Sequence, residues 1–589
     1  MAHTDLHAAG SPTGAGSVVR QTPPAESPEP VDLLWAVKIP LRDGVRLDAT
    51  IYRPRDQMDP LPVVFTLTPY VADSYLDRAL YFAKHGYVFG LVDVRGRGNS
   101  EGVFEPLANE GRDGYDVVEW LAQQPWCNGK VTMWGGSYAG YDQWAAAKHF
   151  PPHLSTIVPA AACYPGVDFP FLNNVRYPYE MQWLTFTSGK TPNAQLFGNA
   201  DFWISKFTEF YMKHLAFKDL DKVVGNDTTT FQNLVAHPTH DSYWGAMTPT
   251  DEEYGRIDIP ILTITGHYDA DQVGALTYYR RHMKHATAKG RDSHFLLIGP
   301  WDHPGTRTPK KEFGGLTFGD ASVLDLNLLH KEWYDWTLKG GQKPEFLKKR
   351  VTYYVAGAET WKYAESLEAV SNESRVLYLG SLNGEANDVF RSGTLSKTMP
   401  ADGPPDRFVY DPLDTRPAEL YQKEIKNFIT DQTNAFNLFG NGVVYHSEPF
   451  AASTEVTGQV SLSACISMDV LDTDFAAELD EVKPDGTSIL LTNDVLRARY
   501  RDSLASERLV VPGEVTRYEF SGFTFFSRLI SKGSRLRLVL NCPNSIFFQK
   551  NYNGGKAVES ESGKDARTAH VSVHHDSEHS SYLTLPVAV

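Results

Sequence analysis

The first half of the chain alternates between short apolar runs and amphipathic stretches. Each apolar run is nearly continuous, as expected for strands that are buried on both faces of a parallel sheet. The runs are VVFTLTPY, YVFGLVDV, KVTMWGG, LSTIVPAA, IPILTITG and HFLLIG. Helical patterns lie between several of them, as at 112–124 and 141–150, and a hairpin that turns at Asp43-Gly44 precedes them. This order predicts an α/β fold, with a mainly parallel sheet and helices on both of its faces.

The alternation stops between about Gly166 and Tyr254, where the chain is rich in aromatic residues and lacks strand runs. We interpret this stretch as a mostly helical insertion over the carboxyl edge of the sheet. Most of its aromatic side chains are expected to form its own core, and a few to line a substrate pocket. After about residue 350 the pattern becomes all-β, and apolar residues from Val460 to Met468 alternate strictly with serine and cysteine. Many strands with turn signals and few helices predict a sandwich or a jelly roll.

Length and composition narrow the class of protein. A chain of 589 residues exceeds what one core usually serves, and its net charge of −16 argues against a nucleic-acid partner. No apolar run approaches the length of a membrane span.

The four cysteines lack CxxC spacing, which indicates reduced, mostly buried thiols. Residues 1–30 are rich in Ala, Gly, Ser and Pro without the features of a signal peptide, which predicts a disordered leader and a cytoplasmic protein, with secretion left open.

The run KVTMWGGSYAGYDQWAAA has the order strand, small-residue turn and helix, with Ser137 at the turn. A nucleophilic serine at such a turn needs small neighbours two residues away, because the turn is sharp and strained. Gly135 meets that requirement, and Ala139 replaces the usual glycine with the next smallest residue. The motif predicts a nucleophile, and the alternative is an ordinary strand–helix turn.

A serine nucleophile needs a base, and the base needs an acid that orients it. In α/β-hydrolases these residues follow the serine in the order acid, then histidine, each after a later strand. Asp269 and His303 follow two successive predicted strands in that order, so we predict the triad Ser137, Asp269 and His303. His267 and Asp302 are competing neighbours that are less well placed. A surface carboxylate and a loop histidine are the alternative interpretations of Asp269 and His303.

The oxyanion of the reaction needs two donors. We assign one to the backbone N–H of Tyr138 and the other to the phenol of Tyr70, which follows an early strand; the alternative for Tyr70 is a packing role. No zinc-protease, P-loop or dinucleotide motif is present, so we predict neither a metal nor a cofactor. The histidines and acids at 571–582 are interpreted as a polar edge and not as a metal site.

These residues resemble the family of bacterial cocaine esterases, α-amino-acid ester hydrolases and X-Pro dipeptidyl-peptidase-like acylases. The resemblance covers nearly everything after the leader. Four of the matching motifs carry the proposed site residues: Pro69-Tyr70, the turn at 135–140, Tyr268-Asp269 and the segment 299–303. Three further matches lie elsewhere: the opening hairpin, HPTHDSYW at 237–244, and VKPDG with LRA near 482–498. The resemblance implies that Tyr70 is an oxyanion donor.

The resemblance also implies the domain layout and a substrate site. We predict an α/β-hydrolase domain over 31–165 and 255–355, a helical cap over 166–254, and a jelly-roll-like C-terminal domain over 356–589. The α-amino-acid ester hydrolases hold the substrate ammonium with carboxylates. Asp271 matches one of these positions, and Gln272 replaces the acid at a second. We therefore expect Asp168, Asp271 and Gln272 to bind the substrate; the alternative for either carboxylate is a solvated loop.

The expected function is hydrolysis of a carboxylic ester or an amide of a small molecule through an acyl-enzyme. Alternatives are an α-amino-acid ester hydrolase or acylase, X-Pro dipeptidyl-peptidase-like activity, and a non-catalytic carbohydrate-binding protein. No membrane partner is expected. A homodimer through the jelly roll is an open expectation.

Overall fold

A ten-stranded mixed sheet organises the N-terminal half of the protein. The computed structural model describes residues 30–421 and 423–589, so nearly all of the predicted leader at 1–30 lies outside the described residues. The strand order is β1-β2-β4-β3-β5-β6-β9-β10-β13-β14, and neighbours from β4 to β13 are parallel. The bounds are β1 Val31–Pro40, β2 Arg46–Pro54, β3 Leu61–Thr68, β4 Val88–Asp93, β5 Cys127–Gly136, β6 Leu154–Ala160, β9 Ile261–Tyr268, β10 His294–Asp302, β13 Val351–Val355 and β14 Thr360–Ala364. The predicted α/β fold with a mainly parallel sheet is confirmed.

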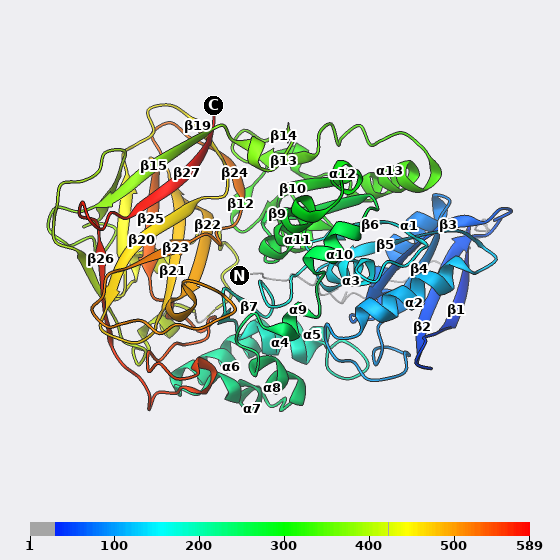
Figure 1. Ribbon diagram of the computed structural model, residues 1–589, viewed down its shortest axis with the longest axis horizontal. Coiled ribbons are helices and arrows are strands. Elements are labelled where there is room, and N and C mark those ends of the chain that lie inside the picture. The colour runs from blue at the N-terminus through cyan, green and yellow to red at the C-terminus, as the bar shows by residue number, and fades with distance from the viewer. Residues whose placement is uncertain (1–29, 422) are drawn as a thin grey trace, which may run out of the picture.

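Helices cover both faces of this sheet because successive strand side chains point to opposite sides. On β3, Val63, Phe65 and Leu67 pack with one set of helices, whereas Val64 packs with the other. The first set is α2 (Glu110–Ala122), α3 (Tyr138–Ala147) and α11 (Gln272–His285). The second set is α1 (Leu76–Lys84) and α13 (Leu326–Lys339). Figure 1 shows these two layers on either side of the strands.

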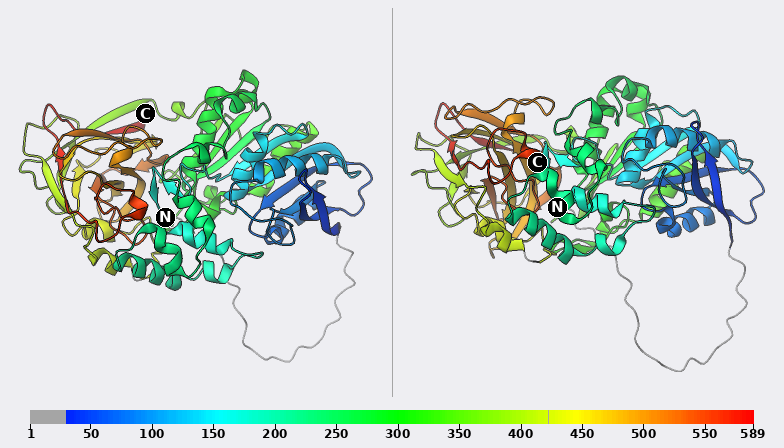
Figure 2. Two further views of the ribbon diagram at one scale, coloured as in Figure 1. Left: turned by 60° about the horizontal axis from the view of Figure 1, so that its bottom comes forward. Right: turned by 90° about the horizontal axis from the view of Figure 1, so that it is seen from below.

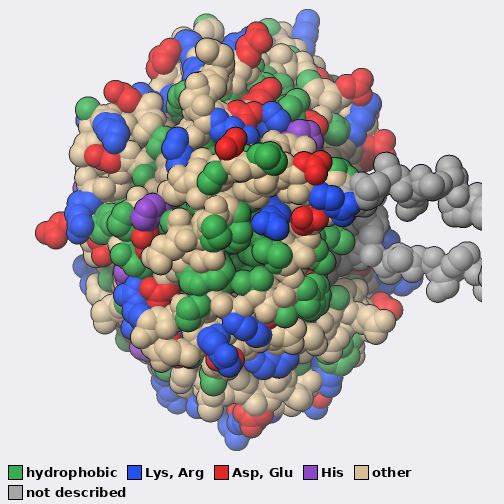
Figure 3. All heavy atoms as spheres, turned by 90° about the vertical axis from the view of Figure 1, so that its right-hand side faces the viewer, with side chains coloured by type: hydrophobic (Ala, Val, Ile, Leu, Met, Phe, Trp, Pro, Cys, Tyr) green, Lys and Arg blue, Asp and Glu red, His purple; other side chains and the backbone are tan. Residues whose placement is uncertain are grey.

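The first strand lies at the free edge of the sheet. It pairs with β2 alone, and its side chains Leu33 and Trp35 stay half exposed. Figure 3 shows the face at this end of the molecule, where hydrophobic side chains gather near the centre with charged ones around them.

A helical cap is inserted between β6 and β9. Its helices are α4 (Tyr179–Phe186), α5 (Ala194–Phe197), α6 (Ala200–Met212), α7 (Leu220–Val224), α8 (Thr229–Val235), α9 (Ser242–Gly245) and α10 (Asp251–Arg256), and a short hairpin, β7 (Phe171–Leu172) and β8 (Val175–Arg176), precedes them. Its buried aromatic residues form one cluster that also includes Tyr138 and Tyr141 of α3. Figures 1 and 2 place the cap between the sheet and the C-terminal domain.

The C-terminal domain is all-β, with thirteen strands in one hydrogen-bonded sheet system around one large apolar cluster. Its strands are β15 Glu373–Gly380, β16 Gly393–Ser396, β17 Asp406–Tyr410, β18 Val443–Ser447, β19 Thr454–Gly458, β20 Ser461–Met468, β21 Asp474–Val482, β22 Ser488–Arg497, β23 Thr516–Phe520, β24 Phe526–Ile530, β25 Arg535–Asn541, β26 Ala569–His574 and β27 Tyr582–Ala588. Along β20 every second side chain from Leu462 to Met468 belongs to that cluster, in agreement with the predicted alternation.

The predicted start of this domain at residue 356 needs correction. Strand β14 lies beyond that point but pairs with β13 in the hydrolase sheet, so residue 356 falls inside a hairpin. The domain therefore begins after Ala364. Strand β24 of the C-terminal domain contacts the β13–β14 hairpin by an isolated β-bridge between Arg528 and Ala356.

The four cysteines are all buried and unpaired, as the sequence predicted. No helix of the described residues is long and apolar enough to cross a membrane.

Candidate active site

Ser137 occupies a strained turn at the carboxyl end of β5. Its φ of 62° and ψ of −127° are a conformation that residues with side chains rarely adopt, and such strain gathers at functional sites. The small neighbours have a steric reason. A Cβ on Gly135 would lie 2.6 Å from the Cβ of Ala139, and one on Gly136 would lie 2.5 Å from Nη1 of Arg307. The turn therefore presents the hydroxyl at the carboxyl edge of the sheet, as a nucleophile requires.

Asp269 and His303 lie together at the same edge. Asp269 follows β9, His303 follows β10, and His303 Nδ1 lies 2.7 Å from Asp269 Oδ1. The other carboxylate oxygen accepts a hydrogen bond of 2.7 Å from Thr265 Oγ1, and the N–H of Asp271 donates to Oδ1. The carboxylate is thus fixed in orientation, and Nε2 of the imidazole is left for a second partner. This arrangement fits a base that is oriented by an acid.

The segment after His303 packs against the turn that carries Ser137. Arg307 follows the 3-10 helix Pro304–Thr306, and its guanidinium is the group that a side chain on Gly136 would strike.

His267 and Asp302, the alternatives to His303 and Asp269, have other partners. His267 is buried near the ring of Phe525 in the C-terminal domain, and its pKa is lowered to about 3 by burial and by the nearby Arg528. Asp302 accepts a hydrogen bond from the N–H of Gly305.

Tyr70 points its phenol at the nucleophile. It lies just beyond β3, and the side chain of Ser137 lies near enough to its hydroxyl to affect the pKa of the phenol. Nε1 of Trp183, on the cap helix α4, donates a hydrogen bond of 3.0 Å to the same hydroxyl. Burial raises the pKa of the Tyr70 phenol well above its ordinary value, so the group stays protonated and available as a donor.

The second donor comes from the helix that follows the nucleophile. Tyr138 is the first residue of α3, so its N–H has no partner within the helix. Its side chain points away from Ser137. The Tyr138 hydroxyl donates to Oε1 of Glu110 and accepts from the N–H of Leu107, each at 2.6 Å. Only the backbone of Tyr138 is therefore available to an oxyanion.

Asp168 and Asp271 both lie near Asp269. Asp271 Oδ2 is 3.8 Å from His303 Nδ1, and its side chain is 13% exposed. Burial, together with Asp168 and Asp269, raises the pKa of the Asp271 carboxyl well above its ordinary value. Burial also raises the pKa of Asp168 to about 7, although its oxygens accept hydrogen bonds from the N–H groups of Tyr164 and Gly274. Of the two carboxyls, Asp271 is the one with no donor among the described residues.

The prediction that Gln272 binds substrate is wrong. Its side chain is fully buried, and Nε2 donates to the carbonyl oxygens of Gly266 and Phe525, each at 2.8 Å. Its Oε1 accepts a hydrogen bond of 2.6 Å from the N–H of Phe525. The amide joins the hydrolase domain to the C-terminal domain and has no group left for a ligand.

Trp183 is the site residue that sequence reasoning missed. It belonged to the set of cap aromatics that were expected mainly to pack, and its partner Tyr70 is 113 positions away. The only sequence signal was its membership in that aromatic stretch, which does not separate a donor from a packing residue.

The structure bears on metal binding as well. Among the described residues, no three His, Cys, Asp or Glu side chains are grouped to hold a metal ion. The predicted polar edge at 571–582 is wrong for His575, whose side chain is fully buried with Nε2 3.2 Å from Oδ2 of Asp406.

Comparison with known proteins gives the chain a family context. The profile of the X-Pro dipeptidyl-peptidase (S15 family) matches residues 43–305, and that of the X-Pro dipeptidyl-peptidase C-terminal non-catalytic domain matches residues 345–584. The cocaine esterase of Rhodococcus sp. strain MB1 Bresler is 28% identical over 94% of this chain and 98% of its own length. The fold is similar to that of an α-amino acid ester hydrolase (20% identity, TM-score 0.79, covering 98% of this chain and 100% of the other). It is also similar to that of an aminopeptidase from a Thaumarchaeota archaeon (21% identity, TM-score 0.81, covering 98% and 99%).

Proposed function

This chain belongs to the family of cocaine esterases, α-amino-acid ester hydrolases and X-Pro dipeptidyl-peptidase-like acylases, and we propose that it hydrolyses carboxylic esters with Ser137 as the nucleophile. The observation that carries the assignment is the 2.7 Å contact between His303 Nδ1 and Asp269 Oδ1, at the carboxyl edge of the sheet where Ser137 also occupies a strained turn. A histidine held by an acid at one nitrogen has the other nitrogen free to take the serine proton.

The reaction has two halves. In the first, His303 Nε2 takes the proton of Ser137 as Oγ attacks the ester carbonyl, and the alcohol leaves with that proton. In the second, water gives a proton to His303 and attacks the acyl-enzyme, and His303 returns that proton to Ser137 Oγ as the bond to the acyl group breaks and the acid leaves; an amine in place of water would give acyl transfer. Asp269 keeps the proton of His303 on Nδ1 in both halves.

The negative charge on the carbonyl oxygen is carried by two donors, the phenol of Tyr70 and the N–H of Tyr138. Both are in place before the substrate arrives, so no reorganisation is needed at the transition state. A donor of this kind contributes about 2.7–4 kcal/mol to transition-state stabilisation.

The test is the hydrolysis of p-nitrophenyl butyrate by the wild type and by Ser137→Ala. Loss of the nucleophile should lower kcat on the order of 10⁶-fold, because triad residues act as a unit. A fluorophosphonate should label the wild type and not the variant. Ser155→Ala is a matched control, since that hydroxyl donates to the carbonyl of His153 at the amino end of β6. Retained activity or labelling in Ser137→Ala would refute the assignment.

A second candidate reaction is hydrolysis of α-amino-acid esters. The observation that favours it is the Asp271 carboxylate, which has no hydrogen-bond donor among the described residues and lies next to His303. A substrate ammonium would supply both a donor and a positive charge there.

An α-amino-acid p-nitrophenyl ester and p-nitrophenyl butyrate separate the two reactions. If the ammonium binds at Asp271, Asp271→Asn should raise KM for the amino-acid ester about tenfold and leave KM for the butyrate ester nearly unchanged. Such a change corresponds to the loss of one charge-assisted hydrogen bond. Equal effects on both esters would leave the plain esterase as the function.

We also propose that the protein works in the cytoplasm. The support is its four unpaired cysteines, because disulfides are rare in reducing compartments.

A further inference from the structure

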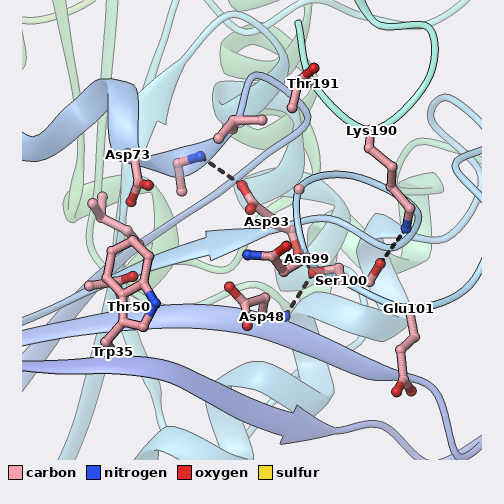
Figure 4. Close-up of a pocket in the computed structure, with 14 residues that line it drawn as sticks. Trp35, Asp48, Thr50, Asp73, Asp93, Asn99, Ser100, Glu101, Lys190 and Thr191 are labelled. Carbon is pink, nitrogen blue, oxygen red and sulfur yellow. Dashed lines mark hydrogen bonds between the residues drawn. The ribbon is translucent and has the colours of Figure 1, made fainter.

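A cavity of about 560 Å³ is lined in part by the residues that directly follow Tyr70, and no residue of the proposed triad lines it. Its walls come from β1, β2, the end of β4, the loop after Tyr70, and the cap segment at 190–191. Figure 4 shows Asp73 on the same side as Trp35, Asp48 and Asp93 near the middle, and Lys190 on the side opposite Trp35. The proposed mechanism uses none of these groups.

Four carboxylates line this cavity; Asp48 and Glu101 are paired with Lys38 and Arg46, whereas Asp73 and Asp93 have no ion-pair partner among the described residues. Asp93 accepts a hydrogen bond from the N–H of Ala72 through Oδ1, and within residues 30–421 and 423–589 its other oxygen has no hydrogen-bond donor. Asp73 forms no ion pair within the same ranges. Asp48 is paired with Lys38 at 2.7 Å, while the ammonium of Lys190 donates to the carbonyl of Ser100.

The electrostatics of Asp93 show that negative charge is crowded here. Burial raises the pKa of Asp93 to about 6, and Asp48 and Asp73 add to the rise. The N–H of Ala72 and the charge of Arg97 oppose it and do not restore the ordinary value. A cation in the cavity would relieve this repulsion.

Two further groups point to an organic ligand. The side chain of Thr50 is only 5% exposed and lines the cavity, yet its hydroxyl has no hydrogen-bond partner among the described residues. The hydroxyl oxygen itself is not enclosed by protein atoms, so it opens to the cavity, where a ligand or solvent group can form a hydrogen bond with it. The indole of Trp35, 60% exposed, stands over the same space and offers an apolar, electron-rich face.

We propose that this cavity binds an organic cation, a primary ammonium group attached to an apolar or aromatic body. The ammonium would donate to Asp73 and Asp93, the body would pack on Trp35, and the Thr50 hydroxyl would receive the partner it lacks. A bare metal ion is disfavoured, because no group of three His, Cys, Asp or Glu in the described chain is arranged to hold one.

Calorimetric titration with phenethylammonium tests this site, with 2-phenylethanol as the neutral probe of the same shape. The protein is Asp271→Asn, so that the carboxylate beside His303 does not bind the probe. The ammonium should bind at least about tenfold more tightly than the alcohol, since one charge-assisted hydrogen bond is worth that much. Equal affinities for the two probes would overturn the proposal.

Variants in the same background locate the binding. Asp73→Asn and Trp35→Ala should each weaken phenethylammonium at least about threefold, while Asp56→Asn, an exposed aspartate that does not line the cavity, should not. Thr50→Val should weaken binding without lowering the melting temperature of the free protein, because the hydroxyl makes no contact that would be lost. Binding that Asp73→Asn and Trp35→Ala leave unchanged would place the probe elsewhere and refute the site.

Discussion

Tyr70 shows how one residue depends on two parts of the molecule. Its ring stacks on Phe186 of the cap at a centroid distance of 5.4 Å and meets Tyr138 edge-on at 6.5 Å. The indole N–H of Trp183 then sets the direction of its hydroxyl. Because the hydroxyl accepts from Trp183, its own proton remains available to an acceptor, and we propose that this acceptor is the oxyanion that forms at Ser137. Trp183 is therefore a positioning residue that acts through Tyr70.

Conservative replacements should separate the donor from the residue that positions it. Tyr70→Phe should lower kcat about 10²–10³-fold with little change in KM, since an oxyanion donor acts in the transition state. Trp183→Phe should lower kcat less than this, because the phenol remains but loses its orientation. The measurement is kcat and KM for p-nitrophenyl butyrate. Trp203→Phe is the matched control, since its indole donates to the carbonyl of Leu196 within the cap. A kcat for Trp183→Phe equal to that of this control would refute the role.

Asp142 is a second residue with a local consequence. It lies on α3, one turn beyond Ser137, and both of its oxygens are buried without a hydrogen-bond partner among the described residues. Burial raises the pKa of its carboxyl well above the ordinary value, and Glu110 adds to the rise. The fold therefore favours the protonated form of Asp142.

This residue should make stability depend on pH. A group whose pKa is higher in the folded than in the unfolded chain binds more protons when folded, so the free energy of unfolding falls as pH rises between the two values. Asp142→Asn removes the titrating group and with it this pH dependence of the free energy of unfolding. The melting temperature of the variant relative to wild type should increase from about pH 5 to about pH 8. The same scan on Asp56→Asn is the control. A difference that stays constant with pH would show that Asp142 is ionised in the fold.

At the scale of elements, the connection from β5 to α3 fixes the site. The strand ends at Gly136 and the helix starts at Tyr138, so a single residue makes the turn. Such a sharp connection brings the first turn of the helix close to the last residues of the strand. Gly135 and Ala139 meet there, and both must be small.

Gly135→Ala should damage this element. The added Cβ would lie 2.6 Å from that of Ala139, at a φ of 150° that side chains rarely adopt, so kcat and the melting temperature should both fall. The double variant Gly135→Ala with Ala139→Gly removes the clash and keeps the backbone strain. It should recover part of the lost activity. If the double variant is no better than the single one, the steric explanation is wrong.

At the scale of the whole molecule, the C-terminal domain supports the site. Gln272 comes three positions after Asp269 and is tied to Phe525 by hydrogen bonds in both directions. The hydroxyl of Tyr268, directly before the triad acid, donates to the carbonyl of Leu490 in the same domain. The loop that carries Asp269, the proposed triad acid, is thus held on both sides of this residue by the C-terminal domain.

Gln272→Ala should weaken this support. It leaves the N–H and the carbonyl of Phe525 buried without partners, at a cost of about 1–3 kcal/mol each. We expect a lower melting temperature and a lower kcat for p-nitrophenyl butyrate. Gln182→Ala, whose amide donates to the carbonyl of Phe197 within the cap, is the control. An unchanged kcat despite a lower melting temperature would limit Gln272 to a structural role.

The sequence by itself determined the elements and the order of the proposed triad. Apolar periodicity reports which faces of a segment are buried, so the α/β sheet, the helical insertion and the all-β region followed from local pattern. The positions of Ser137, Asp269 and His303 also followed, since each is adjacent to a strand end and parallel strands end at one edge.

Only the tertiary structure decided what lies against each buried face. Gln272 is a bridge because Phe525, 253 positions away, packs on it, and Trp183 is a donor because the cap folds over Tyr70. Strand β14 joins the hydrolase sheet because β13 offers it an edge. Local pattern has no information on such partners. They are chosen by the packing of distant segments, and each of these side chains acquires its role from the group that it meets.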